Sequence, residues 1–264
     1  MHQQSTITNL LSKTVLDPDK SLVQQIYRLL WDAIVSLKIL PGQLVSEKEI
    51  AAVLNASKTP VREALIRLED VGLVQVVPQS GTYVTPIQRE AYIEGCFIRL
   101  QLETGAVRRA AQCGGEPNAM ANLVAIMAEQ RVAWEEEDFI RFAALDEAFH
   151  IGLFACAELP GVWDVLQKTQ ADVNRVRHFK RIKGIRRGSA VIEQHETIIE
   201  AIRAKDPDGA AAALVAHIGS LEQEIEKLTK NTELLEFLEN QNTKHSRKFK
   251  GNNPLHATKA RKVI

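Results

Sequence analysis

The sequence has few of the features that mark secreted, membrane or disulfide-rich proteins. Only 5% of its 264 residues are aromatic, and only three are cysteine. No uncharged apolar run reaches the roughly 18 residues that a bilayer span needs, and residues 1–20 lack the apolar core of a signal peptide. Because Cys96, Cys113 and Cys156 are odd in number and widely spaced, they exclude a closed disulfide framework. We therefore expect a cytoplasmic protein with no membrane contact.

The charges of the chain balance overall but are unevenly distributed. Lys plus Arg and Asp plus Glu each number 33, so the total charge indicates neither a nucleic-acid binder nor an acidic partner. Residues 241–264, however, contain seven basic residues and no acidic residue. This basic tail has no apolar periodicity. We expect it to be disordered, either simply solvated or in non-specific contact with a phosphate backbone.

The apolar pattern of residues 21–86 predicts three helices and a hairpin. A helical period stops at Pro41-Gly42, and a capping box at Ser46 and Glu49 opens a second, short helix. A third helix begins near Thr59-Pro60, and β-branched segments then flank a Pro-Gln-Ser-Gly turn. The predicted elements, which together make a winged helix-turn-helix, are helices over 21–40, 46–54 and 59–71 and strands over 73–77 and 82–85.

From residue 90 to about residue 240 the sequence contains only helical patterns, separated by short breaks that contain Gly or Pro. With 45% hydrophobic and 25% charged residues, the 264 residues suffice for about two globular domains. We predict a mainly α protein in which a winged helix-turn-helix with a small β-hairpin wing precedes an all-α helical bundle. The predicted boundaries are a flexible arm over 1–20, the winged domain over 21–86, the helical domain over 90–240 and the basic tail over 241–264.

The second and third predicted helices have the spacing of a helix-turn-helix, whose second helix lies in the major groove of DNA. Lys58 and Arg62, near the start of that helix, can donate to guanine or to phosphate, and the Thr59 hydroxyl suits a phosphate oxygen. Lys48 on the preceding helix can reach the DNA backbone. Such charges also occur on helix pairs that bind nothing, so these residues alone leave DNA binding and a solvated surface equally open. The hairpin wing favours DNA binding.

A continuous set of motifs in residues 21–86 is specific enough to compare with a known family. It comprises EKEIA at 47–51, SKTPVREAL at 57–65, LE at 68–69, GLV at 72–74 and SGTYV at 80–84. These motifs resemble the DNA-binding domain of the GntR family of bacterial transcription regulators. In that family, basic residues of the second and third helices and the glycine at the wing tip contact operator DNA. The resemblance assigns this contact to Lys48, Lys58, Thr59, Arg62 and Gly81. The family more often has Arg where Lys58 stands, and an ammonium reads guanine less specifically than a guanidinium.

Four polar side chains interrupt the apolar faces of helices predicted in the second domain. Asp146 and His150 lie one turn apart on one helix, and His195 and His217 lie on two later helices among apolar residues. Such nitrogen and oxygen ligands suit a divalent first-row cation such as Zn, Ni, Mn or Fe, of which we favour Zn, with positions left open for solvent or a small anion. The alternative is that each is an ordinary core side chain with a polar neighbour.

Three segments carry these four residues. They are DEAFH at 146–150, EQHETIIEAI at 193–202, and DPDGAA at 206–211, which leads to His217. Over about residues 90–225 they resemble the FCD ligand-sensing domain of the FadR subfamily. The resemblance implies that the four residues bind a metal and that a small organic acid binds to this metal inside the bundle.

Three further residues bear on the expected ligand cavity. Arg99 matches the first sensor helix of the family, and either it pairs with a ligand carboxylate or it forms a salt bridge with Glu103, four residues later. Asn174 is a cavity candidate from helix periodicity. Glu158 stands where the family commonly has Asn before Pro160, which leaves the conformation of that turn open.

A metal with open positions could also catalyse hydrolysis, so we considered an enzyme. Ile199 stands where the zincin motif HExxH needs its second histidine, and the sequence has no GxSxG motif, Walker glycine loop or GxGxxG motif. We therefore do not expect an enzyme. A third possibility is a DNA-binding protein with a purely structural metal and no response to acids.

Together these patterns predict a bacterial transcription regulator, a repressor whose operator binding is controlled by a small carboxylate effector at the metal site. We expect a homodimer, held together by its helical domain, that reads a short pseudo-palindrome in double-stranded operator DNA. A coupling of about 1 to 3 kcal/mol between effector and DNA would change operator affinity roughly 5- to 150-fold.

Overall fold

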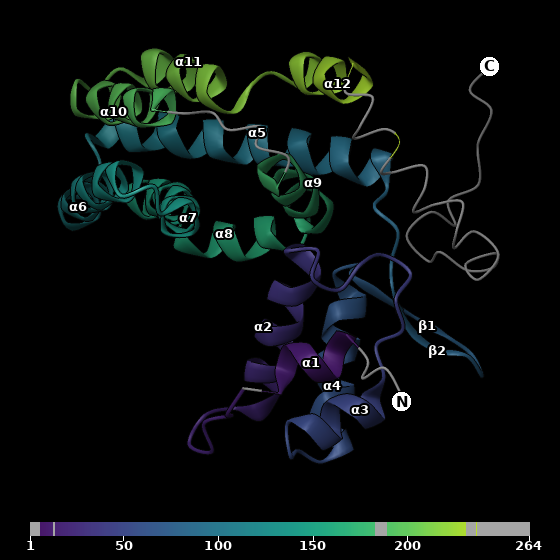
Figure 1. Cartoon of the computed structure of the whole chain (residues 1–264). Coiled ribbons are helices and arrows are strands. Elements are labelled where there is room, and N and C mark those ends of the chain that lie inside the picture. Colours follow the sequence, from purple (N-terminus) through teal and green to yellow (C-terminus); the bar gives the residue numbers. More distant parts are fainter. Residues whose placement is uncertain (1–5, 13, 183–188, 231–235, 237–264) are drawn as a thin grey trace. The chain divides into compact units, whose positions relative to one another are not determined.

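The structure, a computed structural model, describes residues 6–12, 14–182, 189–230 and 236 (Figure 1). The chain divides between Gln88 and Arg89 into two compact units, here called the winged unit and the helical unit. Within the described ranges, no helix has both the length and the apolar composition needed to cross a membrane. The basic tail predicted over 241–264 lies outside the described residues.

The winged unit has the predicted order of elements. The hydroxyl of Ser21 caps α2, and the hydroxyl of Ser46 caps α3 by accepting from the backbone N–H of Glu49. The turn between α3 and α4 passes through Asn55, whose φ of +48° lies in the left-handed region that asparagine tolerates. The elements are α1 (Thr6–Leu11), α2 (Leu22–Val35), α3 (Glu47–Val53), α4 (Lys58–Asp70), β1 (Val74–Val77) and β2 (Gly81–Val84).

Within the arm predicted over residues 1–20, the structure forms the helix α1. This short helix packs against α3, and the side chains of Ile7 and Leu11, one helical turn apart, are both 2% exposed. Two apolar residues at this spacing form one face of a helix, and their burial in the core of the winged unit holds the segment in place.

The hairpin of the winged unit is antiparallel, with Val74 opposite Val84 and Val77 opposite Gly81. Gly81 begins β2 with a φ of +126°, a conformation that side chains rarely adopt. A Cβ at this position would also lie 2.7 Å from Cδ1 of Leu44. The tip of the wing therefore requires glycine at this position.

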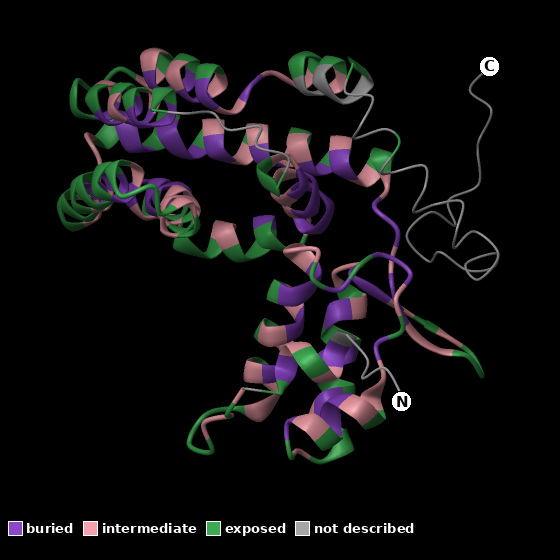
Figure 2. Ribbon diagram, in the orientation of Figure 1, coloured by how far each residue is buried: buried purple, intermediate pink, exposed green. Residues whose placement is uncertain are grey.

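The helical unit contains only helices among its described residues, as predicted. The 25-residue helix α5 is central, because α7, α9, α10, α11 and α12 all contact it, while α6 packs along α7 (Figure 1). Buried and exposed residues alternate along these helices, as expected for elements that turn one face to a shared core (Figure 2). The helices are α5 (Arg89–Cys113), α6 (Pro117–Glu135), α7 (Phe139–Cys156), α8 (Pro160–Gln167), α9 (Ala171–Ile182), α10 (Ala190–Arg203), α11 (Pro207–Ile218) and α12 (Leu221–Lys230).

The turn at Glu158 ends α7 in a Schellman motif. The N–H of Glu158 bonds to the carbonyl of Ala155, and the N–H of Leu159 bonds to the carbonyl of Phe154, both at 2.9 Å. This motif places Glu158 at a φ of +58°, where Asn or Gly is more usual. The turn before Pro160 is thus left-handed, although Glu stands where the family commonly has Asn.

The predicted fold class is confirmed: the protein is mainly α, with a winged helix-turn-helix followed by a helical bundle.

Candidate metal centre and nucleic-acid interface

The structure brings the four predicted metal ligands together inside the helical unit. Asp146 and His150 come from α7, His195 from α10 and His217 from α11. One nitrogen or oxygen atom from each of the four lies within 4.8 Å of the others. The Nε2 atom of His217 is 3.2 Å from Nε2 of both His150 and His195, and Oδ1 of Asp146 is 3.5 Å from Nε2 of His195.

Each of the three imidazoles is held at its other nitrogen by an oxygen acceptor. Nδ1 of His150 faces Oε2 of Glu103 at 2.7 Å. Nδ1 of His195 faces Oε1 of Gln130, and Nδ1 of His217 faces Oε1 of Gln194, both at 3.0 Å. A carboxylate or amide oxygen only accepts, so in the neutral tautomer that satisfies these contacts each Nδ1 carries the proton and each Nε2 presents a lone pair. The rings are also nearly inaccessible, with exposed fractions of 1% or less.

This donor set fits a metal ion. Three lone pairs that converge without a proton between them repel one another unless a cation lies among them. Two imidazole nitrogens that share a metal at about 2.1 Å lie about 3.0 to 3.4 Å apart at octahedral or tetrahedral angles, and the observed 3.2 Å falls in that range. Neutral imidazoles with one carboxylate suit divalent first-row metals.

Asp146 is shared between this centre and Arg177, a residue of α9 that the sequence did not single out. Oδ1 of Asp146 faces the histidines, while Oδ2 accepts a hydrogen bond of 2.7 Å from Nη2 of Arg177. Burial by itself would raise the pKa of Asp146, but the combined attraction of Arg177, His150, His195 and His217 outweighs burial and holds the pKa well below its usual range. Asp146 is therefore ionised and held in one orientation, as a metal ligand needs to be.

Arg99 forms the salt bridge that the sequence left open. Its Nε donates to Oε1 of Glu103 at 2.6 Å, and Glu103, which is fully buried, reaches His150 with its other oxygen. Burial by itself would raise the pKa of Glu103, but Arg99 and His150 outweigh it and lower the pKa to about 2. Arg99 thus neutralises the carboxylate that orients His150, and its two terminal nitrogens make no hydrogen bond to a described residue.

The predicted cavity residue Asn174 lies half-buried on α9, and its side chain makes no hydrogen bond within the described ranges. Sequence reasoning missed Gln130, Gln194 and Arg177. A signal for Gln130 was available, because it interrupts the buried face of α6 between Met127 and Ala133. No comparable signal marks Gln194 or Arg177, whose roles depend on contacts between helices.

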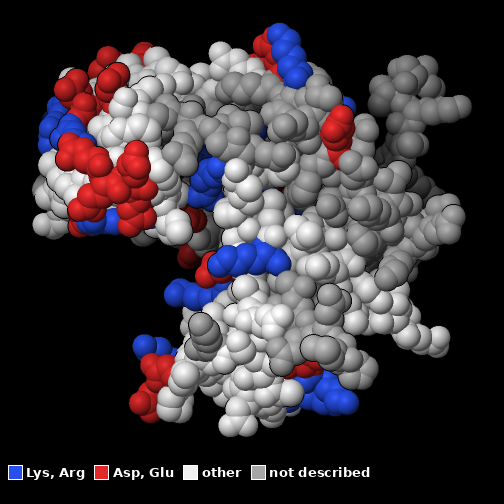
Figure 3. Space-filling view, in the orientation of Figure 1, with Lys and Arg blue, Asp and Glu red and all other residues white. Residues whose placement is uncertain are grey.

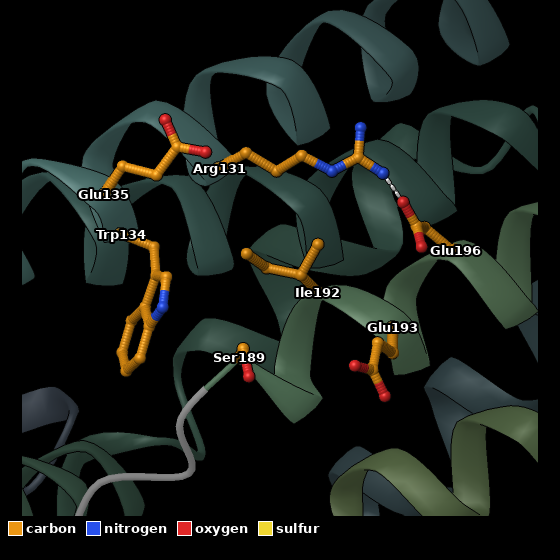
Figure 4. A pocket seen from close by; sticks show the side chains of 7 residues that line it. All are labelled: Arg131, Trp134, Glu135, Ser189, Ile192, Glu193 and Glu196. Atoms are coloured by element: carbon orange, nitrogen blue, oxygen red, sulfur yellow. Dashed lines mark ion pairs between the residues drawn. The ribbon is translucent and has the colours of Figure 1, made fainter.

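A separate cavity of about 250 Å³ lies between α6 and α10 (Figure 4). Its wall includes Trp134, Ile192 and Ser189, and Arg131 pairs across it with Glu196. Glu135 and Glu193 also line it, so its lining carries more negative than positive charge. Figure 3 shows acidic side chains gathered at the end of the helical unit where Figure 1 places α6 and α10. This cavity does not suit an anionic ligand.

The predicted DNA-binding residues lie on the exposed side of the helix-turn-helix and at the wing. Lys58 and Arg62 stand one turn apart on α4 and, like Thr59 and Lys48, are exposed. Arg62 is already engaged: its Nε and Nη2 donate to the two carboxylate oxygens of Glu47 on α3, both at 3.0 Å. Gly81, at the wing, is half-buried.

Comparisons with known proteins agree with this architecture. The family described as "Bacterial regulatory proteins, gntR family" matches residues 22–84, and the family described as "FCD domain" matches residues 94–220. The HTH-type transcriptional repressor RspR of Escherichia coli is 34% identical over 216 residues, which cover 82% of this chain and 94% of RspR. The gluconate operon transcriptional repressor of Bacillus subtilis is 27% identical over 209 residues, or 76% and 84% of the two chains.

Among solved structures, Escherichia coli McbR/YncC has a TM-score of 0.66 at 25% identity, with 80% of this chain and 98% of that chain covered. A winged helix-turn-helix joined to an FCD domain defines a class of transcription regulators. The chain belongs to the GntR family of these regulators. Its relatives are regulators, which confirms the expectation that the protein is not an enzyme.

Proposed function

We propose that this regulator is a repressor that binds operator DNA as a homodimer and releases it when a small organic acid binds to a divalent metal held by Asp146, His150, His195 and His217. The observation that carries the proposal is the convergence of three Nε2 atoms and one carboxylate oxygen, each imidazole being oriented by an acceptor at Nδ1.

The charges around the centre favour an anion as the effector. Arg177 neutralises Asp146, and Arg99 neutralises Glu103. With neutral histidines, a divalent cation would leave this buried site with an excess positive charge. A small carboxylate that joins the metal would supply the missing negative charge, and the terminal nitrogens of Arg99 could donate to it in a bidentate fork. Asn174 remains a proposed cavity residue.

DNA binding is proposed to use the exposed side chains of Lys48, Lys58, Thr59 and Arg62, with the backbone at Gly81 close to the phosphates. A homodimer would present two such surfaces to successive major grooves, so the operator would be a pseudo-palindrome. The effector would act by favouring the dimer conformation in which the two recognition helices do not match the operator.

The proposal is tested by removing the metal and supplying acids. The full chain is purified, its metal content is measured by elemental analysis, and its binding to duplexes enriched from a random library is measured by fluorescence anisotropy. We expect one metal ion per chain and release of the enriched duplex by one class of small carboxylate. Chelator should abolish the response to the acid, and added Zn²⁺ should restore it.

Two variants test whether the acid-dependent release of DNA requires this four-residue centre. His150→Ala should abolish the response to acid while leaving binding of the enriched duplex intact, because it removes one metal ligand from the helical unit. His178→Ala is the matched control, since His178 lies on α9 outside the four-residue centre. Unchanged acid-dependent release in a folded His150→Ala protein would defeat the sensor proposal.

The near-complete burial of the three histidines also suits a structural metal. In that case chelator would lower the thermal stability of the protein, and no acid of the panel would change its DNA affinity. The same experiment therefore separates the two functions.

A further inference from the structure

We propose that Glu47 is a positioning residue for DNA reading: it holds the guanidinium of Arg62 in the orientation in which Arg62 reads one base pair of each half-site. This inference rests on the proposed DNA-binding role of Arg62. It adds an acidic residue to the proposed DNA-binding residues, whose other charged members are all basic.

Arg62 and Glu47 form a bidentate ion pair, here called the clamp. Nε of Arg62 donates to Oε2 of Glu47 and Nη2 of Arg62 donates to Oε1, each at 3.0 Å. Two parallel bonds between a planar guanidinium and a planar carboxylate fix the plane of the guanidinium, which a single bond does not. Attraction by Glu47 also raises the pKa of Arg62.

Glu47 is the more firmly placed partner of the two. It occupies the first turn of α3, directly after the Ser46 cap, and its side chain is 25% exposed, whereas that of Arg62 is 67% exposed. The guanidinium therefore stands in solvent on the surface expected to face DNA, while its anchor belongs to a capped helix. Figure 3 shows basic and acidic side chains next to each other where Figure 1 places α3.

The clamp leaves enough donors for a base. A guanidinium has five N–H groups, of which Glu47 uses two, so three remain. Two of these, one on each terminal nitrogen, point away from Glu47 and match the O6 and N7 acceptors of guanine. Lys58, one turn earlier on α4, makes no hydrogen bond or ion pair to a described residue, and its ammonium has no preferred plane.

The opposing effects of Glu47 make the proposal testable. A carboxylate near the phosphates lowers affinity for any DNA, so its removal should strengthen binding to DNA of random sequence. If Glu47 also orients Arg62, the same removal should weaken discrimination at one base pair. If Glu47 acted only through its charge, its removal would strengthen binding to random DNA and leave the discrimination at that base pair unchanged.

The experiment uses the full chain and duplexes enriched by the wild-type protein from a random library. Dissociation constants are measured by anisotropy for the enriched duplex, for each single base-pair replacement and for a random duplex. The variants are Glu47→Gln, Arg62→Ala and the double variant, with Glu63→Gln as the matched control. Glu63 is an exposed carboxylate next to Arg62 on α4 that makes no hydrogen bond or ion pair to a described residue.

Arg62→Ala should remove the preference at one base pair per half-site, about 5- to 150-fold for a bidentate contact. Glu47→Gln should reduce the preference at that same base pair at least about fivefold, and should change nothing further in the Arg62→Ala background. Both Glu47→Gln and Glu63→Gln should strengthen binding to the random duplex, and Glu63→Gln should keep the base preference. Melting temperatures of all variants should stay within a few degrees of the wild type, because the clamp is exposed.

Two results would overturn the inference while leaving the DNA-binding function in place. One is an unchanged base preference in Glu47→Gln. The other is a loss of preference caused by Glu47→Gln in the Arg62→Ala background, which would mean that Glu47 touches the base itself. If the wild-type protein enriched no sequence from the random library, both the proposed function and this inference would be contradicted.

Discussion

At the scale of single residues, the candidate metal centre depends on buried charges that neutralise each other. Glu103 has no contact with solvent, and it lies between Arg99 and His150. Removal of one partner from such a set of contacts leaves another buried charge uncompensated, which typically lowers the free energy of unfolding by about 3 to 5 kcal/mol. The orientation of His150 thus depends on a residue two contacts away.

The contacts of Glu103 with Arg99 and His150 predict that the stability of the protein falls at acidic pH. The pKa of Glu103 is lowered from an ordinary value of 4.5 to about 2, so the folded state binds fewer protons than the unfolded state between these values. The stability that Glu103 contributes is therefore fully present above about pH 4.5 and is lost as the pH falls toward 2. The loss amounts to about 3 kcal/mol at most.

The measurement is urea unfolding of chelator-treated protein from pH 6 downward, for the wild type and Glu103→Gln. The difference in free energy of unfolding between the two should shrink as the pH falls below 4.5. Glu90→Gln, which changes an exposed carboxylate on the same helix, should show no such trend. A difference that stays constant with pH would contradict the role assigned to Glu103.

Glu158 offers a second prediction, because it occupies a left-handed conformation at the end of α7. Replacement by Gly should stabilise the protein by about 1 kcal/mol, since a residue with a Cβ is strained there and glycine is not. In thermal unfolding this corresponds to a rise of about 2 to 4 °C. Glu158→Ala keeps the Cβ and should bring no gain; an equal gain in both variants would show that the charge, not the backbone, matters.

The residues that were predictable from sequence are those that interrupt an apolar face. Asp146, His150, His195 and His217 each break a helical pattern, and the structure brings them together. The acceptors behind the imidazoles were harder to predict, because a glutamine next to a histidine in space need not be near it in sequence. Arg177 reaches Asp146 from another helix, and periodicity carries no information about such a contact.

At the scale of elements, the approach of α6 to α7 places Gln130 relative to the histidines. The two helices pack closely at Gly152, where a Cβ would lie 2.5 Å from Cδ2 of the fully buried Leu123. Gly152→Ala should therefore destabilise the protein by about 1 to 3 kcal/mol through overpacking. It should also weaken metal binding, because α7 carries His150 and α6 carries the acceptor of His195.

Chemical unfolding and metal titration against a competing chelator measure these two effects. Gly105→Ala is the control, since nothing lies within 4 Å of a Cβ at that helical position, and it should be neutral or stabilising by up to about 1 kcal/mol. Adding Leu123→Ala to Gly152→Ala should cost less than the sum of the single changes. Full stability of Gly152→Ala would mean that the two helices are not held at this distance.

Element boundaries followed from caps and breakers where these were strong. Ser46 begins α3 as predicted, and the Gly114-Gly115 break separates α5 from α6. The helix α1 was not predicted, because its six residues, with Ile7 and Leu11 buried, are too few for a periodic signal. Its burial against α3 is a tertiary contact that the local sequence does not encode.

At the scale of the whole molecule, the candidate metal centre and the proposed DNA-binding residues belong to different compact units. Each unit has its own buried core, and the core of the helical unit is built from its own helices. A metal that binds only the folded helical unit stabilises that unit by mass action, by about 2.7 kcal/mol at a hundredfold excess over its Kd.

Calorimetry of the full chain should therefore show two unfolding transitions, of which Zn²⁺ raises only the one that belongs to the helical unit. The expected rise relative to chelator-treated protein is about 5 to 10 °C, from about 2 to 4 °C per kcal/mol for a unit of this size. His217→Ala should lack the rise, because it removes one of the converging Nε2 atoms. A single transition, or an equal rise of both transitions with Zn²⁺, would contradict the independence of the two units. Coupling of the metal centre to the DNA-binding unit would then be present even without an effector.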